Sequence, residues 1–143
     1  MLIKTLLLTF TILTAVQSSF SQDIKLTDDV LNSSGAIQMT LMVKQNCDKV
    51  NQLFKKDLER KTIFLLLQGG EAPIVYTTDK DFENKYRVYY YDYGCIAPDQ
   101  ECLKRYNYLA FAYLTKTFGK KWRYEVRKDI IGLKEWRKNT KGL

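Results

Sequence analysis

Three cysteines carry the most distinctive chemistry in this sequence of 143 residues, which contains no histidine. Without an imidazole, catalysis by serine or cysteine with a histidine base is excluded, and so are histidine metal sites. The cysteines include no close C-x-x-C pair, which argues against a structural zinc site. We therefore expect no metal, no cofactor and a structural role for the cysteines.

Cys95 and Cys102 bracket a short loop between a tyrosine-rich segment and an apolar helical segment. The end of a strand and the first turn of the next helix can approach within the distance that a disulfide requires. We predict a Cys95–Cys102 disulfide, with Cys47 reduced on the apolar side of its helix. The alternatives are three buried, unpaired thiols, or redox chemistry at Cys102, whose thiol pKa a helix N-terminus would lower.

Asp92 is the candidate acid or base, because it stands at the end of the tyrosine-rich segment, just before Gly94. A buried carboxylate with a raised pKa could exchange protons, with Asp99 or Glu101 as its partner. In the competing interpretation Asp92 accepts backbone hydrogen bonds in the Gly94 loop, or pairs with an arginine of the last helix. We favour this structural role.

The positive charge lies in the C-terminal segment. Residues 116–143 contain ten basic and three acidic side chains, whereas residues 22–115 are nearly neutral. This distribution predicts a face that attracts phosphate or carboxylate groups, although an ordinary solvated surface looks the same. The candidate anion-binding residues are Lys120, Lys121, Arg123, Arg127 and Lys134.

Residues 1–21 have the parts of a secretory signal: Lys4, an apolar run over residues 6–16, and small polar residues through Ser21. The apolar run is too short for a membrane span, which needs about 20 residues. We predict cleavage before Gln22 and a periplasmic or extracellular location, where disulfides persist.

The apolar spacing predicts the elements that position these residues. After a loose arm or short first element over residues 22–35, residues 36–60 favour one amphipathic helix. Alternating apolar residues over 37–43 leave a strand followed by a shorter helix as the alternative. Residues 62–67, 73–77 and 87–93 are the expected strands.

Helices are predicted for the remaining segments. Thr78 or Asp79 caps a short helix ending at Tyr86, and residues 99–118 form a long, mostly buried central helix. A last helix that stops near Gly132 is expected to have an apolar face made by Trp122, Val126, Ile130 and Leu133.

Three segments in this order, FENKY, YYYDYGC and KKWRYEVRKDIIGL, resemble a group of small, uncharacterised secreted bacterial proteins. The resemblance covers residues 62–135. It implies export and a shared fold, and it assigns no activity, cofactor or partner.

We therefore predict an α+β protein with a small mixed sheet packed by helices. Its expected parts are a signal peptide (1–21), a flexible arm (22–35), one domain (36–135) and a basic tail (136–143). The expected function is that of an exported, non-enzymatic binding or accessory protein, with a small periplasmic enzyme using a carboxylate pair or a thiol as the alternative. An anionic envelope component or a protein is the expected partner, rather than nucleic acid.

Overall fold

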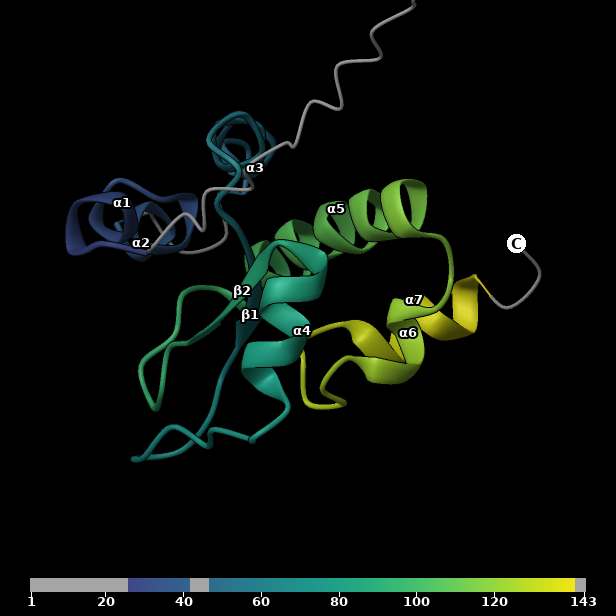
Figure 1. Ribbon diagram of the computed structural model, residues 1–143. Helices are drawn as coiled ribbons and strands as arrows, with labels where there is room; N and C mark the ends of the chain where they lie inside the picture. The colour runs from purple at the N-terminus through teal and green to yellow at the C-terminus, as the bar shows by residue number, and fades with distance from the viewer. Residues whose placement is uncertain (1–25, 42–46, 141–143) are drawn as a thin grey trace, which may run out of the picture.

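The computed structural model describes residues 26–41 and 47–140 and has the predicted α+β architecture. The predicted signal sequence lies outside the described residues. In the view of Figure 1, the helices of the first third of the chain lie on one side of the sheet and the last two helices lie on the other. The elements, in chain order, are α1 (Asp28–Asn32), α2 (Gly35–Thr40), α3 (Val50–Glu59), β1 (Ile63–Leu67), α4 (Asp79–Tyr86), β2 (Val88–Asp92), α5 (Gln100–Phe118), α6 (Trp122–Glu125) and α7 (Leu133–Asn139).

The sheet consists of β1 and β2, which pair in parallel from Ile63 opposite Val88 to Leu67 opposite Asp92. All five residues of β1 are buried, as expected for a parallel strand that is covered on both faces. The sheet is smaller than the predicted mixed sheet and purely parallel, since residues 73–77 form no strand. Their apolar residues, Ile74, Val75 and Tyr76, suggest an extended segment, but all three are exposed and no strand among the described residues pairs with them.

The central helix α5 matches the predicted span of 99–118 closely. Its start is fixed by Asp99, whose side chain accepts a hydrogen bond from the Glu101 backbone N–H, and its end by Gly119 at φ +73°. The buried face consists of Cys102, Leu103, Tyr106, Asn107, Ala110, Phe111 and Leu114. This face packs on β1 and on α3.

Side chains of α5 close the outer edge of β1. The Asn107 amide accepts from the Leu66 N–H at 2.8 Å and donates to the Leu66 carbonyl at 2.9 Å, much as a neighbouring strand would. The Tyr106 hydroxyl accepts from the Phe64 N–H at 3.4 Å. Because buried backbone groups need partners, this pairing lets a two-stranded sheet lie in the core.

Residues 36–60, for which one long helix was predicted, contain two helices, α2 and α3. Residues 28–32 form α1, so the arm contains a short first element, while α2 and α3 are separate helices. A strand over 37–43 is also wrong, because residues 35–40 are helical. Residues 42–46 lie outside the described residues.

Asp57 of α3 ties these helices to the rest of the core. Its carboxylate accepts from the Gly35 N–H at 2.9 and 3.0 Å and from the Tyr106 hydroxyl at 2.6 Å. Asp57 is completely buried. Burial raises the pKa of its carboxyl group, and the bonds from Tyr106 and Gly35 partly oppose that rise.

The C-terminal segment does not form the single helix that the spacing predicted. Val126 is extended after α6, and Gly132, at φ +80°, precedes α7. The apolar positions were nevertheless identified correctly, since Trp122, Val126, Ile130 and Leu133 are all buried. Helix α7 continues through Asn139, so residues 136–139 of the predicted tail are helical, and Trp136 packs against Trp122 with ring centres 5.6 Å apart.

Candidate functional site

The cysteines are paired differently from the prediction. Cys102 forms a disulfide with Cys47, 55 residues earlier, and Cys95 is a free, exposed thiol. Cys47 immediately precedes the turn into α3, and α3 packs against α5, so the two sulfurs meet through tertiary packing. The predicted Cys95–Cys102 bridge within the loop is therefore incorrect.

Asp92 has the structural role that the sequence favoured. Its Oδ1 accepts from the Gly94 N–H at 2.9 Å and from the Gly69 N–H at 2.7 Å, joining the loops that follow the two strands. The proposed partners are engaged elsewhere: Asp99 caps α5, and Glu101 pairs with Lys104 at 2.8 Å. Each of the three carboxylates therefore holds a different part of the structure: Asp92 holds the two loops, Asp99 caps α5, and Glu101 pairs within the first turns of α5.

Arg127 belongs to the interior of the fold and not to a basic surface. Only 7% of its side chain is exposed, and its guanidinium pairs with Asp79 at 3.2 Å and Asp129 at 2.6 Å. It also donates to the Ile74 carbonyl at 2.7 Å and lies 4.8 Å from the centre of the Tyr76 ring. The arginine does turn inward, as one alternative held, but its partners are Asp79 and Asp129 instead of Asp92.

The other predicted basic residues lie on the surface in different settings. Lys120, Lys121 and Lys134 are exposed. Arg123 is partly buried, with its guanidinium 4.7 Å from the centre of the Trp136 ring. The predicted set therefore forms no single basic helix face.

A basic pocket forms between α6, the following turn and α7. It has a volume of about 470 Å³ and is lined by Arg123, Tyr124, Val126, Lys128 and Arg137. Arg137 donates to the Arg123 carbonyl, which holds α7 against α6. The buried Nε of Arg123 has no hydrogen-bond partner among the described residues. We call these five residues the basic pocket.

The sequence indicated the charge of this segment but not the basic pocket itself. Lys128 and Arg137 are not among the predicted residues, because the sequence does not show that α7 folds back against α6. The change of direction at Gly132 brings Arg137 back to Arg123. Gly132 indicates a break in the helical pattern, but not the direction in which the chain continues.

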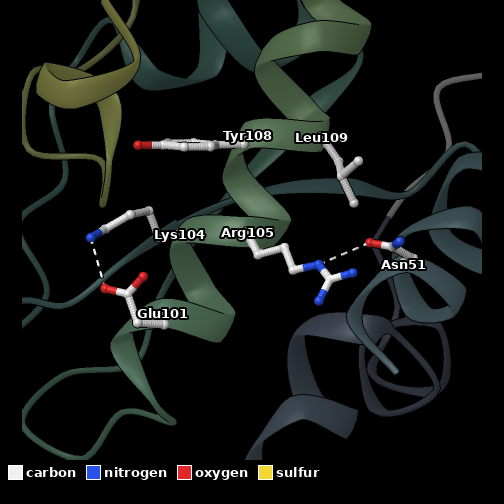
Figure 2. Close-up of a pocket in the computed structure, with 6 residues that line it drawn as sticks. All are labelled: Asn51, Glu101, Lys104, Arg105, Tyr108 and Leu109. Carbon is white, nitrogen blue, oxygen red and sulfur yellow. Dashed lines mark hydrogen bonds and ion pairs between the residues drawn. The ribbon is translucent and has the colours of Figure 1, made fainter. Parts of the chain in front are cut away.

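A second depression, of about 350 Å³, lies on the outer face of α5 (Figure 2). Its charged groups are already paired, Lys104 with Glu101 at 2.8 Å and Arg105 with Asn51 at 3.2 Å. Figure 2 shows these two pairs on opposite sides of the helix, with Tyr108 and Leu109 above them. The arrangement fits a solvated helix face better than a ligand site.

Comparison of the chain with protein-family models, with curated proteins and with solved structures finds no match. Among the described residues, no helix has the length and apolar character that crossing a membrane requires. The disulfide is compatible with an exported protein.

Proposed function

We propose that this chain is exported and works as a non-enzymatic binding protein, which holds an anionic group in the basic pocket. Export is supported by the N-terminal signal pattern and by the Cys47–Cys102 disulfide, since such bonds persist in oxidising compartments. A catalytic role has less support, because Asp92, Asp99 and Glu101 each hold a different structural contact.

The observation that carries the proposal is the convergence of three basic side chains, Arg123, Lys128 and Arg137, around one cavity. The rest of the lining is Tyr124, which is 91% exposed, and the buried Val126. No acidic side chain lines this cavity among the described residues. A phosphate or carboxylate group would find several donors there, including guanidinium groups that suit planar or tetrahedral oxyanions.

The envelope of a bacterial cell offers such anions as lipid head groups and acidic glycans. Around the pocket, the exposed Lys120, Lys121 and Lys134 would add a weaker, diffuse attraction. Exposed charges are screened over about 8 Å at physiological ionic strength. Binding should therefore weaken as salt is added, most strongly for the part contributed by these exposed lysines.

Retention on heparin and on anionic vesicles tests the proposal. The pocket variant is K128Q with R137Q, and the matched control is K120Q with K121Q, which removes two positive charges outside the pocket lining. We expect the pocket variant to lose most of its retention near physiological salt and the control to lose little, with thermal melts showing both folded. Equal losses in the two variants, or no loss in either, would refute a role for the pocket.

A further inference from the structure

A third cavity, of about 320 Å³, lies at the carboxyl ends of the parallel strands. Leu67 and Asp92, the last residues of β1 and β2, both line it. The loops that follow the two strands project from the same end of the sheet (Figure 1). In sheets with parallel strands, the carboxyl ends are where ligands commonly bind, because the loops there diverge around a crevice.

The walls of this cavity are mainly apolar and aromatic. Pro73, Ile74 and Val75 form one side, and Tyr90 and Tyr91 contribute from β2. Ile74 is 57% exposed and Val75 is 78% exposed, so these side chains border the opening without sealing it. The volume and lining suit the body of a small molecule.

The hydrogen-bonding groups in the cavity favour a ligand that donates hydrogen bonds over an anionic ligand. The guanidinium of Arg127 is already committed to Asp79, Asp129 and the Ile74 carbonyl. Asp79, which is only 6% exposed, uses its Oδ2 for Arg127 and for the Tyr76 N–H, while its Oδ1 has no partner among the described residues. A buried carboxylate oxygen without a donor is unfavourable, so a ligand that supplies one is stabilised there.

The charge of the lining points the same way. Asp79, Glu83 and Asp92 are carboxylates, against two cations, Lys80 and Arg127. Glu83 accepts the Tyr90 N–H at 2.9 Å and pairs with Lys80 at 3.3 Å, so these two charges offset each other and the lining as a whole keeps an excess of one negative charge. Positive ligands are therefore favoured over negative ones.

We propose that this cavity binds a small protonated alkylamine, whose ammonium group donates to Asp79 Oδ1 and whose alkyl chain lies against Ile74, Val75 and Tyr91. Oδ1 is covered from solvent, so the ammonium reaches it through a small displacement of residues 73–76. That segment lies outside the helices and strands, and two hydrogen bonds hold it, from Arg127 to the Ile74 carbonyl and from the Tyr76 N–H to Asp79 Oδ2. This site is independent of the basic pocket and prefers the opposite charge.

Titration of the ¹⁵N-labelled exported protein with n-butylammonium chloride tests the site, with 1-butanol and sodium butyrate as probes of equal chain length. We expect saturating backbone amide shifts at Tyr76 and Tyr91. Butylammonium should bind about tenfold or more tightly than either other probe, since it alone offers a charged donor. Equal binding of butanol or butyrate, or shifts that never saturate, would overturn the proposal.

Two variants, V75K and D79N, test whether the ligand binds in this cavity, and a third, I96K, is the control. V75K introduces a competing ammonium at its border and should weaken butylammonium binding about tenfold or more, because like charges repel. I96K makes the same change at a residue that is 89% exposed and outside the lining, and should bind like the wild type. D79N should also lose binding. Wild-type affinity in V75K would overturn the proposal even where D79N fails to fold.

Discussion

Some polar side chains are buried in the core and connect its elements through hydrogen bonds, and Asp57 is the main example. Its carboxylate joins α2, α3 and α5 through Gly35 and Tyr106. Apolar periodicity could not reveal this, because Asp57 reads as one of many charged residues in an amphipathic helix. The inward arginine is comparable: Arg127 was assigned to a surface by helical spacing, yet its partners Asp79 and Asp129 hold it inside.

The Asp57 carboxyl makes a specific contribution to the pH dependence of stability. Its folded-state pKa is raised above the unfolded value of 3.8, mainly by burial. The folded protein therefore binds this proton more tightly than the unfolded chain does. The resulting stability is fully present below the unfolded pKa and is lost as the pH rises through the folded pKa.

The variant D57N lacks this titration and sets an amide N–H against the N–H of Gly35. We expect it to be about 1 to 3 kcal/mol less stable than the wild type near pH 4, with a smaller deficit at neutral pH. Urea unfolding of both proteins across this pH range measures the difference and cancels the other carboxyl groups. A deficit that grows with pH would contradict the assignment.

Whole elements were predicted best where the apolar repeat was long and uninterrupted. The central helix α5 was found because seven of its residues face the core at helical spacing. Residues 122–133 have similar spacing but form α6 and a turn, because a chain that folds back on itself can bury the same positions. The strand predicted at 73–77 is wrong because a short apolar segment does not reveal whether a neighbouring strand exists to pair with it.

Gly132 fixes the position of α7 against α5, and its substitution tests that element. A Cβ at this position would lie 2.6 Å from Lys104 Cγ and 2.8 Å from Tyr108 Cε1, and the φ of +80° already disfavours other residues. We expect G132A to lower the unfolding free energy by about 1 to 3 kcal/mol.

Gly70 provides the control for this substitution, because a Cβ there meets no atom within 4 Å. G70A should change stability by no more than about 0.5 kcal/mol, or raise it slightly. Thermal melts of the two variants beside the wild type make the comparison. Equal melting temperatures for G132A and the wild type would show that the turn before α7 is not constrained as described.

At the scale of the whole molecule, the Cys47–Cys102 disulfide links the start of α3 to the first turn of α5. The sequence could not choose this pair, because loop length favoured the nearer Cys95, and only the packing of α3 on α5 brings Cys47 close. The basic pocket could not be predicted for a similar reason. The sequence shows the positive charge of the C-terminal segment, but the pocket forms only because the chain changes direction at Gly132.

Removing this disulfide should be costly. In the chain-entropy model, a bridge between residues 55 apart stabilises the fold by about 4 kcal/mol. We expect C47S with C102S to lose about this much in urea unfolding, whereas C95S, at an exposed thiol, should change stability by less than about 0.5 kcal/mol. Non-reducing peptide mapping should recover Cys47 linked to Cys102. Recovery of Cys95 linked to Cys102 would contradict the structure.

The closure of the β1 edge by Asn107 has a consequence for the order in which the chain is synthesised. Leu66 leaves the ribosome 41 residues before Asn107. At about 5 to 20 residues per second, the segment IFLLL waits roughly 2 to 8 s for the amide that will cover its backbone. During that interval it is a short, uncharged, β-prone strand of the kind that self-associates. We therefore expect this segment to be prone to association in any chain whose central helix has not yet packed against it.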